Sequence, residues 1–290
     1  MQRWKSKLQV RGVIMKKVVK FGGSSLANAE QFQKVGDIIR SDESRRYVVP
    51  SAPGKRFDED IKVTDMLYGC YDAASKGEDI TEKINAIKAR YYEIIKGLGL
   101  SLSLEEEFKK IDEDFRAQAG IQYAASRGEF LNGKIMAAYL GYDFVDAASV
   151  IRFDKAGNLE AEETNKLLSK KLSKSQHAVI PGFYGACADG TVKTFSRGGS
   201  DVTGSLVAKA IHADIYENWT DVSGFLVTDP RIVHNPEPIE AITYRELREL
   251  SYMGATVLHE DAIFPVRKEG IPINIRNTNS PEDKGIPSLR

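Results

Sequence analysis

Three short turns in this sequence combine glycine with side chains that can bind charged ligands. They are residues 22–25 (Gly-Gly-Ser-Ser), 51–54 (Ser-Ala-Pro-Gly) and 198–201 (Gly-Gly-Ser-Asp). Glycine lets a backbone come close to a phosphate, and the N–H groups at the start of a following helix point at its charge. Lys20 stands just before the first turn, where its ammonium group can reach phosphate oxygens. Together the turns predict a phosphate-binding site, although a glycine pair alone is more often an ordinary turn.

The sequence around these turns predicts strands that alternate with helices. Residues 18–21 and 47–49 are β-branched runs that lead into the first two turns, and Ala29–Arg40 between them has helical spacing. From residue 64 to about residue 141 the pattern is helical, and we expect Glu129 to open the last helix of that stretch. Such alternation predicts an α/β fold with a mostly parallel central sheet flanked by helices.

The remaining elements follow from the same patterns. Strands are expected near residues 143–145, 150–153, 178–180 and 214–217, with 271–275 as the last strand, and residues 183–195 read as a hairpin. Helices are expected over residues 162–172 and 202–210 and, capped, after Thr243 and His259; Ser103 and Glu106 form a candidate capping box. In an open sheet of this kind, ligands bind at the carboxyl ends of the strands, where the three turns lie.

Four ordered blocks give the sequence a specific family resemblance. They are residues 18–26 (Val-Val-Lys-Phe-Gly-Gly-Ser-Ser-Leu), 126–129 (Ser-Arg-Gly-Glu), 197–203 (Arg-Gly-Gly-Ser-Asp-Val-Thr), and 219–231, which contains Trp-Thr-Asp-Val-Ser-Gly and Thr-Asp-Pro-Arg. The sequence resembles the catalytic domain of aspartate kinases in the amino-acid kinase superfamily, over about residues 16–285. The resemblance implies transfer of the γ-phosphoryl of ATP, with Mg²⁺, to the β-carboxylate of L-aspartate. The product, 4-phospho-L-aspartate, begins the route to lysine, threonine and methionine.

The resemblance also implies roles for individual residues. Lys20 and Asp201 are expected to be catalytic, with Lys20 on the triphosphate and Asp201 orienting it. The other residues implied to bind ATP are Gly22, Gly23, Ser24, Thr220, Asp221, Leu226, Thr228, Pro230 and Arg231. The residues implied to bind aspartate are Ser51, Thr64, Glu129, Arg197, Gly198 and Ser200.

The chemistry of the residues agrees with these roles. A guanidinium group grips a carboxylate in a planar fork, which suits Arg197 to the α-carboxylate of aspartate, and Glu129 supplies the charge that an α-ammonium needs. The nucleophile is a carboxylate that is already ionised at neutral pH, so no general base is required. Catalysis then depends on in-line positioning and on Lys20 and Mg²⁺, which offset charge on the transferring phosphoryl.

The sequence departs from the family at three places. Thr256 stands where many relatives have a lysine, and Leu226 stands where some have a tyrosine against the adenine. Residues 55–62 lengthen the loop between Ser51 and Thr64, and the sequence pattern predicts no structure for them. A second protein cation near the phosphates is therefore not assured by the sequence.

Composition limits the function classes that remain. The 41 Lys and Arg residues balance 41 Asp and Glu residues, which gives no support to nucleic-acid binding. Two cysteines are too few for a disulfide framework and favour a cytoplasmic protein, and no apolar run is long enough for a membrane span. Residues 1–14 are basic but lack the apolar core of a secretory signal, so they read as a tag or an upstream extension.

Domain organisation and alternatives are also expectations at this point. Residues 15–285 are expected to form one catalytic domain, with an amino-acid-binding lobe to about residue 182, a nucleotide-binding lobe from about 183, and a homodimer as the assembly. Relatives usually continue into two ACT domains, whereas this sequence ends five residues after Gly285, so we expect no inhibition by lysine or threonine. Neither a P-loop nor protein-kinase motifs occur. Acetylglutamate, glutamate 5- or uridylate kinase, or a non-catalytic sensor, are the alternatives.

Overall fold

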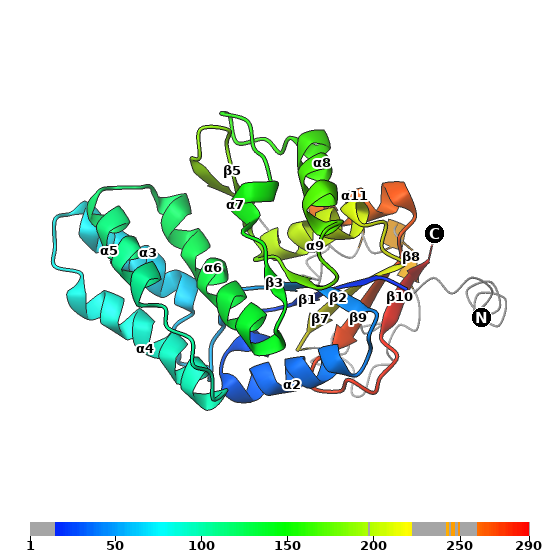
Figure 1. The fold of residues 1–290 in the computed structure, drawn as a ribbon, viewed down its shortest axis with the longest axis horizontal. Coiled ribbons are helices and arrows are strands. Elements are labelled where there is room, and N and C mark those ends of the chain that lie inside the picture. Colours follow the sequence, from blue (N-terminus) through cyan, green and yellow to red (C-terminus); the bar gives the residue numbers. More distant parts are fainter. Residues whose placement is uncertain are drawn as a thin grey trace.

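A mostly parallel sheet with helices on both faces organises the chain (Figure 1). The computed structural model describes residues 15–196, 198–221, 242–243, 245–246, 249 and 260–289. Within them the strand order of the large sheet is β3-β4-β2-β1-β7-β9-β10-β8, and in this sheet the β9–β10 pair alone is antiparallel. The strands are β1 Lys17–Phe21, β2 Arg45–Pro50, β3 Asp143–Phe144, β4 Ala178–Val179, β7 Ile215–Thr220, β8 Ile242–Thr243, β9 Ile273–Asn277 and β10 Ile286–Leu289. The predicted α/β fold class is confirmed.

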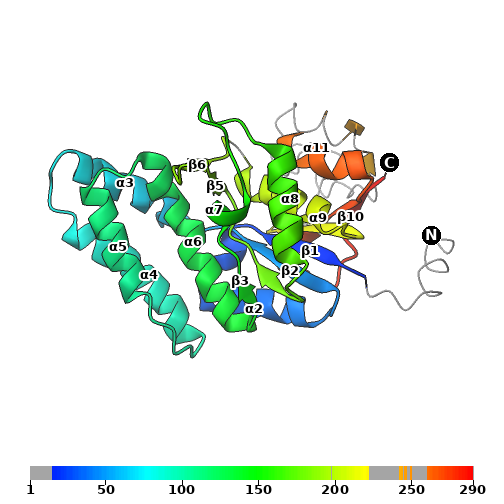
Figure 2. The ribbon, with the colours of Figure 1, turned by 45° about the horizontal axis from the view of Figure 1, so that its top comes forward.

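The two faces of the sheet carry two separate apolar cores. Val18 belongs to one core and Val19 to the other, because side chains alternate along a strand. The helices that pack on the Val18 face are α7 Ala147–Val150, α8 Ala161–Leu172, α9 Gly199–Ala210 and α11 Glu260–Glu269. Figure 2 shows this layer in front of the central strands. The predicted hairpin is β5 Tyr184–Ala186 with β6 Val192–Thr194.

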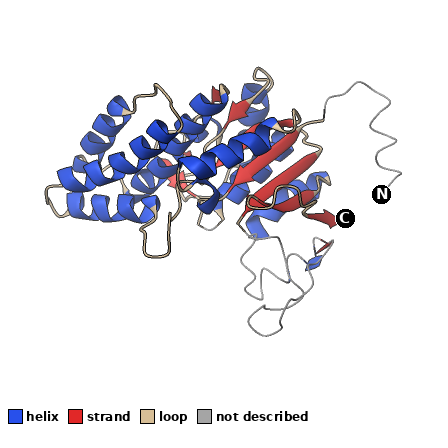
Figure 3. Ribbon diagram, turned by 90° about the horizontal axis from the view of Figure 1, so that it is seen from below, coloured by secondary structure: helices blue, strands red, loops and turns tan. Residues whose placement is uncertain are grey.

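Helices in the N-terminal half form the other layer and a projecting helical group. α2 Ala29–Arg40 covers the sheet, and its N-cap Asn28 accepts a hydrogen bond from the backbone N–H of Gln31. The group beyond the carboxyl ends of β1 and β2 consists of α3 Val63–Ser75, α4 Thr81–Gly97, α5 Glu105–Arg116 and α6 Ile121–Leu140 (Figures 1 and 3). None of the helices in the described ranges is long and apolar enough to cross a membrane.

Several sequence-based boundaries are wrong, and each has a physical reason. α6 begins at Ile121, so Glu129 lies in the middle of the helix rather than at its start. Both sides of this helix are buried, which removes the apolar–polar alternation that reveals a helix in a sequence. α5 begins after Leu104, so Ser103 and Glu106 do not form the expected capping box.

Two strand predictions also need correction. Residues 150–153 do not form a strand: Val150 ends α7, and only single bridges occur at Arg152 and Phe153. The strand near 271–275 is β9, but it is not the last, because β10 follows it and pairs with it. These errors fall where short segments are set by neighbouring elements rather than by their own periodicity.

Candidate functional site

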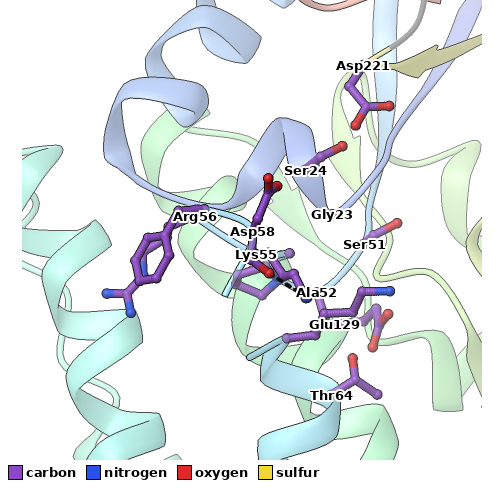
Figure 4. Close-up of a pocket in the computed structure, with 14 residues that line it drawn as sticks. Gly23, Ser24, Ser51, Ala52, Lys55, Arg56, Asp58, Thr64, Glu129 and Asp221 are labelled. Atoms are coloured by element: carbon purple, nitrogen blue, oxygen red, sulfur yellow. Dashed lines mark hydrogen bonds between the residues drawn. The ribbon is translucent and has the colours of Figure 1, made fainter. Parts of the chain in front are cut away.

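A cavity of about 620 Å³ opens at the carboxyl ends of β1 and β2, where the turns after both strands meet α3 and α6. Six residues predicted for nucleotide or aspartate binding line it, Gly23 and five others, and Figure 4 shows them around one space. The five others are Ser24, Ser51, Thr64, Glu129 and Asp221. The remaining lining residues are Ala52, Pro53, Gly54, Lys55, Arg56, Phe57, Asp58 and Lys62. The cavity thus gathers chain segments that are as far apart as residues 23 and 221.

Two glycines hold the first two turns against each other. The backbone N–H of Gly54 donates to the carbonyl of Gly23 at 2.8 Å. A Cβ at Gly23 would lie 2.9 Å from the carbonyl oxygen of Ala52, and a Cβ at Gly54 would lie 2.6 Å from the carbonyl carbon of Gly23. Because both contacts are with backbone, any larger residue would separate the turns and change the floor of the cavity.

Lys20 is oriented by two polar neighbours from different elements. Its Nζ lies 2.8 Å from Asp201 Oδ1 on α9 and 3.4 Å from Asn218 Oδ1 on β7. Asn218 Nδ2 donates to the same Asp201 oxygen at 3.0 Å, so the three side chains form a closed arrangement. Lys20 and Asn218 meet because the register between β1 and β7 places them directly opposite each other. Lys20 lies just before Gly22, whose Cβ, if present, would be 3.8 Å from Nζ.

Glu129 is a buried carboxyl group with incomplete hydrogen bonding. The residue is 6% exposed, and its Oε2 has no hydrogen-bond partner among the residues that the structure describes. Burial raises the pKa of Glu129 to about 8, against a smaller opposing effect from the backbone N–H of Ala52. Figure 4 shows the carboxyl group beside Thr64 and Ser51, facing the cavity. A buried, unpaired carboxyl group at a cavity wall is a candidate partner for a cationic ligand group.

The other predicted residues are absent from the cavity lining or lie outside the described residues. Gly198 has a φ of +55° and caps α9, the helix that carries Asp201. Ser200 is buried against Gly182, where an added Cβ would meet its hydroxyl oxygen at 2.4 Å. Thr220 ends β7 and donates to Asp221 at 3.2 Å. The predicted residues outside the described ranges are Arg197, Leu226, Thr228, Pro230 and Arg231, together with Thr256.

Sequence reasoning missed three contributors to the site. Asn218 completes the arrangement around Lys20, and Asn132 on α6 donates to the carbonyl of Ser51 at 2.6 Å. Residues 55–62, whose structure the sequence did not predict, form part of the cavity wall. The asparagines stand next to residues that were singled out, but a lone asparagine in a strand or helix carries no signal of its own. In the described part of the chain, no group of three or more His, Cys, Asp and Glu side chains could hold a metal ion.

Comparisons of the sequence and of the structure with known proteins point to the same family. Residues 15–277 match the model of the amino acid kinase family. The sequence is 40% identical to Aspartokinase 3 of Bacillus subtilis, over 93% of this chain and 62% of that protein. The fold resembles the crystal structure of Clostridium acetobutylicum aspartate kinase with a TM-score of 0.89 and 51% identity, over 95% of this chain and 62% of that one.

A second structure adds bound ligands to the comparison. Escherichia coli aspartokinase III, solved in complex with aspartate and ADP, matches with a TM-score of 0.81 and 27% identity, over 94% of this chain and 64% of that one. The chain therefore spans less than two thirds of the length of each of these relatives. The family match over residues 15–277 includes the Lys20 arrangement, the cavity beside Glu129 and every strand of the large sheet except β10.

Proposed function

We propose that this chain, which belongs to the amino acid kinase family, transfers the γ-phosphoryl group of ATP to the β-carboxylate of L-aspartate. The observation that carries the proposal is the unpartnered Oε2 of buried Glu129 in a cavity that also contains Ser51 and Thr64. A primary ammonium group would complete the hydrogen bonding of that carboxylate, and an amino-acid substrate provides one. The relative solved with aspartate and ADP supports the same pair of ligands for this chain.

Substrate binding should be coupled to ionisation of Glu129. With its pKa raised to about 8 by burial, the carboxyl group is mostly protonated at neutral pH in the free protein. An ammonium ligand favours the ionised form, so binding of the amino acid releases a proton to solvent. Ser51 and Thr64 add hydroxyl groups from the end of β2 and the first turn of α3. These groups fix the orientation in which the side-chain carboxylate of the substrate faces the nucleotide.

Phosphoryl transfer would depend on Lys20 rather than on a general base. Asp201 and Asn218 hold the Lys20 ammonium at the end of β1, next to the glycine turn. From there it can offset negative charge on the transferring phosphoryl, while the ionised carboxylate attacks in line. The arrangement costs little reorganisation, because the lysine is already held before the nucleotide binds.

Mg²⁺ is expected to arrive with the nucleotide. In nucleotide-dependent sites this ion is bound mainly by phosphate oxygens and water, with one or two carboxylates. Asp221 is an exposed carboxylate at the cavity edge beside Ser24 (Figure 4), and it fits the role of such an additional ligand. When bound, the ion would neutralise charge on the phosphates, and Lys20 would add to that effect.

A trapping assay tests the proposal directly. With ATP, Mg²⁺ and L-aspartate, the acyl phosphate product should react with hydroxylamine to give a hydroxamate, and ADP should form in equal amount. The variant Lys20→Ala should lower kcat by about 10²–10⁴-fold, the effect of losing a charge that stabilises the transition state. Equal turnover with glutamate or N-acetylglutamate would move the substrate assignment elsewhere in the family. Absence of turnover, with amino-acid binding retained, would favour a non-catalytic sensor.

A further inference from the structure

The loop that lengthens the connection between Ser51 and Thr64 forms a wall of the cavity. Lys55, Arg56, Phe57, Asp58 and Lys62 all line the cavity, although the sequence pattern predicts no structure for them. All five residues are exposed, and Phe57 is 56% exposed. The loop therefore contributes cationic, acidic and aromatic side chains to the cavity wall.

Arg90 on α4 fastens both ends of this loop. Its Nη2 donates to the carbonyl of Gly54 at 3.0 Å, and its Nη1 donates to the carbonyl of Ile61 at 3.1 Å. Nη1 also lies 3.0 Å from Asp60 Oδ2, and both side chains are at least nine-tenths buried. One guanidinium group thus closes the loop at its base, because its planar fork can bind several oxygens at fixed positions.

A second arginine completes the support from inside the loop. Arg56 Nε and Nη2 donate to the two oxygens of Asp60, at 2.9 and 3.0 Å, and Arg56 Nη1 donates to Glu93 on α4 at 2.9 Å. The hydrogen bond from Arg56 holds the pKa of Asp60 well below its usual range, so Asp60 is ionised. Figure 4 shows Arg56 directed away from Ser51, Thr64 and Glu129. The Arg56 guanidinium group is therefore paired within the protein and is not directed at a ligand.

Lys62 differs from Arg56 because its ammonium group pairs with no carboxylate of the described residues. Within the described residues, the Lys62 ammonium has no ion pair or side-chain hydrogen bond, whereas Lys55 Nζ donates to the carbonyl of Asp58 at 2.9 Å. Lys62 is the N-cap residue of α3, two residues before Thr64. Figure 4 shows Thr64 and Glu129 at one end of the cavity and Ser24 and Asp221 at the other, so the backbone of Lys62 adjoins the Thr64 end.

We propose, on the premise of the function above, that Lys62 binds a carboxylate of the amino-acid substrate and that Arg90 is the positioning residue that holds the loop for this contact. An acidic amino acid carries two carboxylates, and Glu129 attracts only its ammonium group. A cation at the Thr64 end of the cavity would bind one of the two carboxylates, while Glu129 binds the ammonium group. The free ammonium of Lys62 and the α3 N-terminus, with its partial positive charge, act together on the same ligand.

The test is a comparison of steady-state constants for Lys62→Met and Lys62→Arg with the wild type. Lys62→Met should raise KM for aspartate about threefold to thirtyfold, the range for a partly exposed charge-assisted contact, with KM for ATP unchanged. Lys62→Arg should recover part of the loss. Added salt should raise KM for aspartate less in Lys62→Met than in the wild type, because the screened attraction is missing. The control is Lys83→Met, an exposed lysine on α4 outside the cavity, which should match the wild type.

Arg90→Lys tests the positioning role. It should raise KM for aspartate in the same way, and adding Lys62→Met to it should then cost less than it does in the wild type, because the loop is no longer held. Asp60→Asn, which keeps the side-chain shape, serves as the second variant if Arg90→Lys unfolds. Independent effects of Arg90 and Lys62, or an unchanged KM for aspartate in Lys62→Met, would overturn the inference. If the wild type has no aspartate-dependent turnover, the proposed function fails first, so the two failures are distinguishable.

Discussion

Two buried glutamates, Glu217 in the sheet and Glu129 beside the cavity, meet the same cost of burial in opposite ways. Glu217 accepts from Arg45 Nε at 2.8 Å and from Trp219 Nε1 at 3.0 Å, and Lys17 Nζ lies 3.2 Å away. Among the described residues, Glu129 has no ion-pair partner, one of its oxygens is unpartnered, and burial raises its pKa. The described part of the chain thus supplies the partners of Glu217, whereas the proposed function assigns the partner of Glu129 to the substrate. Under that proposal, pairing within the chain separates a structural carboxylate from a binding one, although both are buried.

The largest effect is expected from breaking the paired site. Glu217→Gln removes the charge that faces Arg45, so this buried guanidinium group loses its counter-charge, whereas Lys17 keeps its pair with Asp42 at 2.7 Å. The free energy of unfolding should fall by about 3–5 kcal/mol, as for other broken buried pairs. Denaturant unfolding measures it, with Glu30→Gln as the control, because Glu30 is in an exposed pair with Lys34. If Glu217→Gln lowers the free energy of unfolding no more than the control does, Glu217 is not a structural carboxylate.

Glu129→Gln should instead change substrate binding. The amide keeps the shape but cannot supply a charge to an ammonium group, so kcat/KM for aspartate should fall about 10²-fold, or about 2.7 kcal/mol. KM for ATP should change little, because Ser24 and Asp221 lie at the other end of the cavity. In the wild type, apparent affinity for aspartate should rise as the pH approaches about 8, with proton release on binding; Glu129→Gln should lose both. A uniform loss toward both substrates would contradict the assignment.

The same substitution should affect stability in the direction opposite to Glu217→Gln. In the unfolded chain Glu129 ionises near 4.5, whereas in the folded protein its pKa is about 8. Below 4.5 the carboxyl group is protonated in both states and has no effect. Between 4.5 and 8 the unfolded state loses the proton first, so the wild type becomes less stable as the pH rises. Glu129→Gln cannot ionise.

The stability of Glu129→Gln relative to the wild type should therefore grow from pH 5 to pH 8. The expected increase is about 2 kcal/mol once water in the open cavity is allowed for. Thermal melts of both proteins at the two pH values measure the difference, and 10 mM aspartate should reduce it by stabilising the wild type. A constant difference between pH 5 and pH 8 would mean that Glu129 is not held protonated in the free protein.

The smallest effect is expected at Asp201, which is neither as fully paired as Glu217 nor as unpaired as Glu129. Lys20 and Asp201 are paired within the chain, yet both are partly exposed. Asp201→Asn keeps a hydrogen-bonding group near Lys20 but removes its charge, so kcat should fall about tenfold through poorer positioning. KM for aspartate should change less than it does in Glu129→Gln. A fall in kcat as large as that of Lys20→Ala would give Asp201 a direct role in the reaction.

The sequence by itself determined the elements with strong periodicity and the turns that follow them. The β-branched run of β1 and the spacing of Ala29–Arg40 reveal a strand and a helix, because each buries one regular set of side chains. The order of the glycine turns and of the Lys20 and Glu129 blocks also indicated a family and a reaction. These features are local in the chain, so a linear pattern can contain them.

Only the tertiary structure decided which residues meet and which charges are completed. The sequence placed Glu129 at a helix start, but burial on both sides of α6 concealed the true start at Ile121. The register of β1 against β7 brings Asn218 to Lys20 across 198 residues, and Arg90 reaches both ends of a loop that begins 36 residues earlier. Contacts at such separations depend on how the whole sheet and the helical group assemble. No local pattern could therefore distinguish the paired Glu217 from the unpaired Glu129.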